Sequence, residues 1–298
     1  ENRSEANDTT INKLLKEQKF YIDYFQREYR WGENHIKTLI EDLTTTFLKS
    51  YKEGDKPEEV ANYQGYYLGP IVFSINPETA KKSIIDGQQR ITSITLLLIY
   101  LNNIQKDFDE DDKVPVADLI FSLKHRVKSF NMTDETREDC LKALFETGEY
   151  SLKEDDDETV ANMLERYVDI ENAFPEDIDE NVLPYFIDWF TENVVVIEIK
   201  AYSDENAYTI FETMNDRGLN LTSTEMLKGY VLSKISDSKQ RNEINDVWKK
   251  QMRLLHSYDK NADHSFFQAW FRGRYAVSIR PGKAGSENKK FELIGSRF

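Results

Sequence analysis

The sequence predicts an α+β fold, and three of its features carry that prediction. Long apolar stretches with helical spacing alternate with short β-rich runs, so both kinds of element are expected. Two of the β-rich runs lie close enough together in the chain to form a hairpin. Aromatic residues are plentiful (16 Tyr, 17 Phe and 4 Trp), whereas Gly and Pro number only 12 and 7, which indicates a folded and mainly helical chain. With 298 residues, a sizeable core is expected.

The N-terminal part is expected to begin with a short helix over residues 8–20 and an extended run over 20–22. A polar loop, Tyr24-Phe25-Gln26-Arg27-Glu28-Tyr29-Arg30-Trp31, leads to a second helix that starts near Glu33. The apolar residues of this helix recur at helical spacing, at Ile36, Leu39, Ile40, Leu43 and Phe47.

Residues 66–73 and 82–85 are predicted strands, because both runs are rich in β-branched and aromatic residues. The turn residues Asn76-Pro77-Glu78 lie between them, so we expect the two strands to pair as a hairpin. The helix that follows is apolar on nearly every side between Ile91 and Leu101. It is therefore expected at the centre of the core.

Residues 107–190 are predicted to form a helical insertion, because short amphipathic segments there alternate with acidic loops. The acidic runs 107–112 and 154–158 lack the glycine and the closing glutamate of a calcium loop. They are interpreted as solvated loops. A β-rich composition returns at residues 194–199, which is typical of a buried strand.

The remainder of the chain is predicted to be helical. Ser203-Asp204 is a suitable N-cap, and the helix after it ends at Asn215-Asp216-Arg217-Gly218, where Gly218 suits a left-handed C-cap. Residues 222–225 match a capping box, and residues 240–276 continue as helix. The Gly-, Ser- and Lys-rich end is expected to lead into a further domain.

The net charge of −15 is unevenly divided along the chain. From Trp270 to Phe298 seven cations stand against two glutamates, a net +5 that leaves −20 on the residues before them. An acidic body argues against broad non-specific binding of nucleic acid, because that binding depends on neutralising phosphates with Lys and Arg. A local basic groove is still compatible with this charge.

The sequence also indicates a compartment. No run reaches about 18 consecutive apolar residues, and the first residues lack the pattern of a secretory signal, so neither a membrane span nor secretion is expected. Cys140 is the only cysteine, which excludes an internal disulfide and fits a reducing cytoplasm. Without a nearby His in the sequence, Cys140 is interpreted as a packing residue rather than a nucleophile.

The most informative motif is Ile84-Ile85-Asp86-Gly87-Gln88-Gln89-Arg90-Ile91-Thr92. An apolar strand runs into a glycine turn and then into a helix, whose first N–H groups find no acceptor within the helix. With the positive end of the helix dipole behind them, such groups are typical of phosphate sites. Asp86 adds a candidate metal ligand, and Arg90 a permanent cation. An ordinary strand-to-helix turn with a surface arginine is the alternative interpretation.

Two further polar clusters lie at the ends of apolar elements, Gln26-Arg27 with Arg30 and Asn215-Asp216-Arg217-Gly218. Each cluster taken alone is explained by surface cations or by a helix terminator. Loops that converge at one edge of a sheet often form the pocket for a charged ligand. We therefore expect the three clusters to form one site.

The same segments resemble, in order, the signatures of the GmrSD-type restriction endonuclease N-terminal domain, the DGQQR family. The resemblance rests on residues 25–31, 85–92 and 211–218, with Leu221 and Lys228, and covers residues 10–240. It implies a ParB/sulfiredoxin-like fold, a small mixed sheet with packed helices. It also implies a domain that binds and hydrolyses a nucleoside triphosphate and controls a nuclease in defence against foreign, often modified, DNA.

The motif and the resemblance together assign roles to residues. Asp86, Gln89 and Arg90 are expected to be catalytic, and Asp86 is also expected to hold Mg²⁺ or to orient the attacking water. Contacts to the nucleotide phosphates are expected from Gln26, Arg27, Gly87, Gln88, Thr92, Asn215, Arg217 and Gly218. A redox activity like that of sulfiredoxin is not expected, because Gln88 and Gln89 stand where that chemistry needs a cysteine.

The expected domains are a nucleotide-binding core over residues 1–106 and 191–240, the helical insertion over 107–190, and a C-terminal helical region over 241–298 with the basic tail. Expected partners are DNA and an HNH-type nuclease domain or subunit, and a homo-oligomer stays open. DNA cleavage is not expected from these residues, because the four histidines, His35, His125, His256 and His264, form no metal motif.

Two alternatives to a nucleoside triphosphatase stay open. The first is a non-catalytic switch that binds a nucleotide or DNA and signals to a nuclease. The second is a module that chiefly binds DNA through the cations of its tail.

Overall fold

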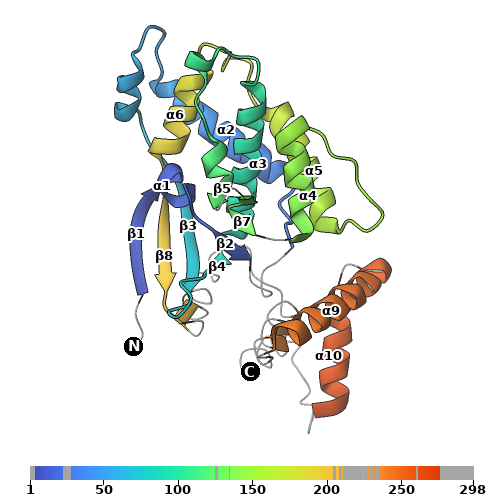
Figure 1. The fold of residues 1–298 in the computed structure, drawn as a ribbon. Coiled ribbons are helices and arrows are strands. Elements are labelled where there is room, and N and C mark those ends of the chain that lie inside the picture. Colours follow the sequence, from blue (N-terminus) through green and yellow to red (C-terminus); the bar gives the residue numbers. More distant parts are fainter. Residues whose placement is uncertain are drawn as a thin grey trace, which may run out of the picture. The chain divides into compact units, whose positions relative to one another are not determined.

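The computed structural model describes residues 4–22, 28–124, 127–133, 135–203, 237–259 and 261–275, with positions 206, 207, 210, 224, 227, 228, 231, 232 and 235 (Figure 1). These residues divide into two compact units. The first unit holds the described residues up to position 210, and the second holds those from position 224 onward.

The main sheet of the first unit is mixed and has six strands in the order β1-β8-β3-β4-β2-β7. Its strands are β1 (Ser4–Thr10), β2 (Phe20–Ile22), β3 (Tyr66–Ile75), β4 (Lys82–Asp86), β7 (Met132–Thr133) and β8 (Val194–Ala201). β3 pairs parallel with β8 and antiparallel with β4, and β4 pairs parallel with β2. Together with the helices, this sheet confirms the predicted α+β class.

The helices of the first unit pack on this sheet and on one another (Figure 1). Among the described residues they include α1 (Ile11–Leu15), α2 (Glu33–Ser50), α3 (Gln88–Ile104), α4 (Glu135–Thr147), α5 (Glu158–Ala173) and α6 (Leu183–Asn193), with 3₁₀ turns at Pro57–Asn62, Glu110–Asp112 and Ala117–Leu119. α3 packs against α4 and α5, and α5 packs against α2. Every residue of α3 from Ile91 to Ile99 is buried, which confirms its predicted central place.

The predicted hairpin is confirmed as β3 and β4. Their register places Phe73 opposite Ile84, and both side chains are fully buried. The turn between the strands is stabilised by Asn76, whose Oδ1 accepts hydrogen bonds from the N–H groups of Glu78 and Thr79 at 2.9 Å. This hairpin fixes the position at which α3 begins.

The helix expected over residues 8–20 is much shorter. Residues Ser4–Thr10 form β1, which pairs antiparallel with β8 along its whole length, and α1 occupies only Ile11–Leu15. The helix starts at residue 11 because Thr10 caps it, with its Oγ1 accepting from Lys13 N at 3.3 Å. β1 was not predicted, because its sequence, SEANDTT, has no alternation of apolar and polar residues.

Residues 107–190, the predicted helical insertion, contain helices α4 and α5 and most of α6, and they contain short strands that the sequence did not predict. β5 (Phe121–Lys124) and β6 (Val127–Phe130) form a small antiparallel sheet, and β7 joins the main sheet beside β2. The rings of Phe121 and Phe130 lie 4.3 Å apart across the small sheet. Side chains of this segment share one hydrophobic core with the rest of the first unit. The boundaries at 106/107 and 190/191 stay predictions.

In the second unit, the helix expected over residues 240–276 is divided in two. α9 (Ser238–Tyr258) and α10 (Ala262–Tyr275) pack through Trp248 and Phe267, whose rings stack at 5.4 Å. The break occurs at Asp259, whose Oδ1 accepts from Asn261 N at 2.8 Å and so competes with the helix. The expected Gly218 cap and most of residues 204–236 lie outside the described residues. In the described part of the chain, no helix combines the length and apolarity needed to cross a membrane.

A buried ion pair crosses the main sheet near the start of β4. The ammonium group of Lys82 reaches over the ring of Phe73, 4.3 Å from its centroid, and bonds Glu198 on β8. The side chains of Lys82 and Glu198 are only 12% and 11% exposed. Lys200 also lies 3.3 Å from the Glu198 carboxylate. Burial lowers the pKa of Lys82, while Glu198 opposes this change and Lys200 adds to it.

We predict that Glu198→Gln destabilises the fold by about 3 kcal/mol near pH 7, because it leaves the Lys82 charge buried without a carboxylate. The substitution also lowers the pKa of Lys82 further. Between that lowered value and the ordinary value of 10.5, the unfolded chain binds a proton that the folded chain has lost, so stability rises with pH in this window. The deficit relative to wild type should therefore shrink between pH 7 and pH 10 in urea unfolding.

The double variant Lys82→Met/Glu198→Leu is the control, since it removes both charges. It should lie within about 1 kcal/mol of wild type or be more stable than wild type. A deficit of Glu198→Gln that is the same at both pH values would contradict this interpretation.

Candidate functional site

The turn between β4 and α3 has the geometry that the motif predicts. Gly87 adopts a left-handed conformation (φ 99°, ψ 7°) and is the N-cap of α3, with its carbonyl accepting from Ile91 N at 3.0 Å. A Cβ atom at this position would lie 2.9 Å from Cγ1 of Ile71 on β3. Both the conformation and the close approach therefore require glycine. Because Gly87 has no side chain, it provides no cap for the first N–H groups of α3.

Arg90 is a partly buried cation in the first turn of α3. Its Nη1 donates to the carbonyl oxygen of Pro70 on β3 at 3.0 Å. Its guanidinium lies against the left-handed Gly69, where a Cβ atom would be only 3.2 Å from Cζ. No carboxylate of the described residues forms an ion pair with Arg90. The structure thus holds a permanent positive charge beside the helix N-terminus without neutralising it from within the described part of the chain.

Gln88 and Thr92 point into the protein. They are 2% and 0% exposed, and Nη1 of the buried Arg137 on α4 donates to Gln88 Oε1 at 3.2 Å and to Thr92 Oγ1 at 3.0 Å. Direct phosphate contact, which the sequence predicts for both, would require these bonds to change. Arg137 was not singled out in the sequence, although its spacing to the buried Cys140 and Leu144 places a cation on the apolar face of α4.

Gln89 binds the polar loop that precedes α2. Its Oε1 accepts from the N–H groups of Arg30 at 2.8 Å and Trp31 at 3.1 Å, and its Nε2 donates to the carbonyl oxygen of Glu28 at 3.0 Å. The amide predicted to be catalytic is therefore engaged at both ends by backbone groups of this loop. We call residues 28–32 the loop segment.

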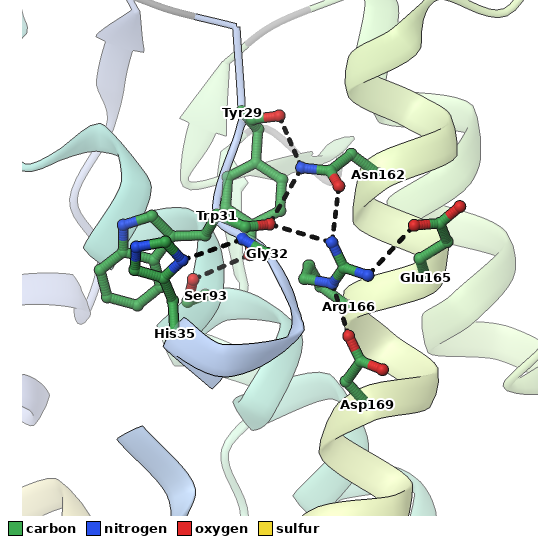
Figure 2. A network of polar contacts seen from close by, with 9 residues as sticks. All are labelled: Tyr29, Trp31, Gly32, His35, Ser93, Asn162, Glu165, Arg166 and Asp169. Carbon is green, nitrogen blue, oxygen red and sulfur yellow. Dashed lines mark hydrogen bonds and ion pairs between the residues drawn. The ribbon is translucent and has the colours of Figure 1, made fainter. Parts of the chain in front are cut away.

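The loop segment is also held by α5 (Figure 2). Asn162 Nδ2 donates to the carbonyl oxygens of Tyr29 at 2.8 Å and Trp31 at 3.1 Å, and Arg166 Nη1 donates to Trp31 O at 3.1 Å. The hydroxyl groups of Tyr29 and Ser93 lie 2.9 Å apart, a buried bond to α3. Burial is the largest cause of the raised pKa of Tyr29, which keeps this phenol protonated.

Asp86 is the last residue of β4, is partly buried, and lies opposite Val72 of β3. Within the described ranges, no group of three or more His, Cys, Asp or Glu side chains is arranged to hold a metal ion. A carboxylate such as Asp86 fits Mg²⁺ nonetheless, because this ion is commonly held by one or two carboxylates together with the phosphates of a substrate.

The other predicted site residues, Gln26, Arg27, Asn215, Arg217 and Gly218, lie outside the described residues. Of the three polar clusters, the structure brings together Asp86 to Arg90 and the residues that directly follow Arg27. Convergence of all three clusters stays a prediction.

Cys140 is buried on α4, and burial raises the pKa of its thiol to about 12. A thiol that stays protonated is a poor nucleophile. This agrees with its interpretation as a packing residue.

The comparisons with known proteins agree with the motifs. Residues 11–232 match the model of a family described as GmrSD restriction endonuclease, N-terminal domain. The match contains β4, Gly87, α3 and the loop segment, and it also spans Gln26, Arg27 and residues 215–218. No curated protein matches the chain significantly.

We predict that Gly87→Ala lowers the free energy of unfolding by about 2–4 kcal/mol, because the new methyl group adds a clash with Ile71 to the cost of a left-handed alanine. Gly54→Ala is the matched control. Gly54 has φ 90°, but nothing lies within 4 Å of its Cβ position, so only the conformational cost of about 1 kcal/mol applies. Chemical denaturation of both variants measures the difference. Equal losses would show that the contact with Ile71 is unimportant.

Proposed function

The chain belongs to the family of GmrSD restriction endonuclease N-terminal domains, and within such a system we propose that it binds a nucleoside triphosphate at the β4–α3 turn. Membership makes the chain part of a restriction system that defends against phage. In such a system, this domain would supply the nucleotide site, with the turn binding the phosphate groups of the nucleotide.

The observation that carries the proposal is the state of Arg90. A partly buried guanidinium is costly unless a negative charge compensates it, and the described residues provide no carboxylate for it. The carbonyl oxygen of Pro70 accepts a hydrogen bond from one N–H group of Arg90, so the planar guanidinium is held in one orientation rather than rotating freely. A phosphate beside the N-terminus of α3 would supply the missing charge.

The other residues have distinct roles in this proposal. Gly87 allows the backbone to approach the phosphates, and Asp86 would hold Mg²⁺, which supplies neutralisation of phosphate charge when bound. Gln88 and Thr92 support the first turn of α3 through Arg137 rather than touching the ligand. From the sequence, Gln26, Arg27, Asn215, Arg217 and Gly218 are proposed as further phosphate contacts, with the two arginines on the outer phosphates.

Hydrolysis is the second part of the proposal. Asp86 is the candidate to orient the attacking water, and Arg90 to stabilise the charge that develops on the transferred phosphoryl group. Gln89 is less suited to orient water, because both ends of its amide bind the loop segment. This engagement favours one alternative specifically, a switch that binds the nucleotide without turnover and signals to a nuclease domain or subunit acting on DNA.

We predict that Arg90→Ala weakens binding of the preferred nucleoside triphosphate by about 10- to 100-fold, the usual worth of hydrogen bonds to a charged group. Titration calorimetry with ATP, CTP, GTP and UTP in the presence of Mg²⁺ identifies that nucleotide and measures the loss. Lys106→Ala is the control, since it removes the same charge just beyond the other end of α3, sixteen residues or about 24 Å along the helix. Unchanged affinity in Arg90→Ala would overturn the proposed site.

For Asp86→Asn, the predicted effect depends on the metal. In EDTA the variant should bind the nucleotide as tightly as wild type or more tightly, because a negative charge near the phosphates is removed. With Mg²⁺ it should lose both the gain in affinity that the metal gives to wild type and any phosphate release. If wild type releases no phosphate, with or without DNA, the non-catalytic switch is the correct form of the proposal.

A further inference from the structure

The loop segment is fixed from two sides by buried or partly buried side chains (Figure 2). On one side, Gln89 and Ser93 of α3 bind its N–H groups and the Tyr29 hydroxyl. On the other side, α5 binds its carbonyl groups. The end of the segment is tied as well, because Gly32 N donates to His35 Nδ1 at 3.1 Å.

The α5 side of this contact is built from two residues one helical turn apart, Asn162 and Arg166. Nδ2 of Asn162 serves two carbonyl groups, and Trp31 O receives a second bond from Arg166. Arg166 Nη1 also donates to Asn162 Oδ1 at 2.8 Å, so the two side chains orient each other. Arg166 is 9% exposed, and its Nε and Nη2 pair with Asp169 at 2.5 Å and Glu165 at 3.1 Å.

These partners make the α5 contact a preorganised one. A buried arginine with four of its five N–H donors occupied has little freedom to leave Trp31 O. The same bonds leave the side chain of Arg30, between the two clamped carbonyl groups, exposed to solvent. The backbone of the loop segment is therefore ordered by side chains of residues that lie up to 135 positions away in the sequence.

The place of the loop segment in the chain gives this ordering a consequence. Its first residue, Glu28, directly follows Gln26 and Arg27 in the sequence, and its backbone binds Gln89, the neighbour of Arg90. The segment therefore contacts the part of the proposed site that the structure describes, at Gln89. Fixing the backbone of the segment limits the motion of this contact and lowers the ordering cost of ligand binding beside it.

We infer that Asn162 and Arg166 are positioning residues for nucleotide binding, acting through the loop segment without touching the ligand. This inference rests on the proposed function. Helix α5 lies in the predicted insertion, residues 107–190, outside the predicted nucleotide-binding core. The inference gives this helix a role in setting nucleotide affinity. By reciprocity, a bound nucleotide strengthens the contact between α5 and the loop segment by the same factor.

Two variants test the inference, Asn162→Ala and Arg166→Lys, the second of which keeps the charge but cannot reproduce the planar fork. Asn103→Ala is the matched control. Asn103 on α3 also donates to a backbone carbonyl and a side-chain oxygen, Leu144 O at 2.7 Å and Tyr167 Oη at 2.8 Å, but it has no contact with the loop segment. Titration uses whichever of ATP, CTP, GTP and UTP binds wild type most tightly, with Mg²⁺.

We expect Asn162→Ala and Arg166→Lys to weaken nucleotide binding about tenfold, and Asn103→Ala to leave it within about twofold of wild type at a similar loss of stability. In a Gln89→Ala background, Asn162→Ala should cost clearly less nucleotide affinity than in wild type, because the contact between the loop segment and α3 through which it acts is already lost. Without nucleotide, amide exchange over residues 28–35 should be faster in both α5 variants than in Asn103→Ala.

The outcomes separate the inference from the proposed function. If wild type binds none of the four nucleotides, the proposed function is overturned. If Arg90→Ala binds the nucleotide more weakly than wild type, but the α5 variants match Asn103→Ala, only the positioning role is overturned. An equal cost of Asn162→Ala with and without Gln89 would also overturn it, because the effect would then not act through the contact of the loop segment with α3.

Discussion

The close approach of the Gly87 backbone to the side chain of Ile71 is the constraint on which the candidate site depends. It sets the residue at which α3 begins, and a helix turns by about 100° per residue, so the next three side chains point in three directions. Gln88 faces Arg137 on α4, Gln89 faces the loop segment and Arg90 faces the Gly69–Pro70 stretch of β3. A different start for α3 would redistribute all three contacts at once.

The residues of the DGQQR motif, Asp86 to Arg90, therefore have both structural and chemical roles. Its two glutamines hold neighbouring elements in place through buried or partly buried hydrogen bonds, and such bonds are costly to leave unmade. Its arginine is secured by a single carbonyl bond and keeps an uncompensated charge among the described residues. Supporting a reactive group with well-packed polar neighbours is how a site stays preorganised while its ligand is absent.

Much of the fold could be predicted from local patterns. The hairpin, the central α3 and strand β8 all carry apolar runs with clear periodicity or strong β composition, and all three were confirmed. The missed elements lack such signals, since β1 is polar and β5, β6 and β7 are only two to four residues long. The turn and Arg90 were also evident in the sequence. Asn162 and Arg166 were not, because their partners lie more than 130 positions away and no local pattern marks them.

In the proposed site, a phosphate of a nucleoside triphosphate neutralises the charge of Arg90. A crystal structure of the chain with Mg²⁺ and a non-hydrolysable analogue of its preferred nucleotide would test this contact. We expect a phosphate oxygen within hydrogen-bond distance of the Arg90 guanidinium and the first turn of α3, with the loop segment still bound to Gln89 and Asn162. An analogue bound elsewhere, with Arg90 contacting only Pro70 O, would contradict it.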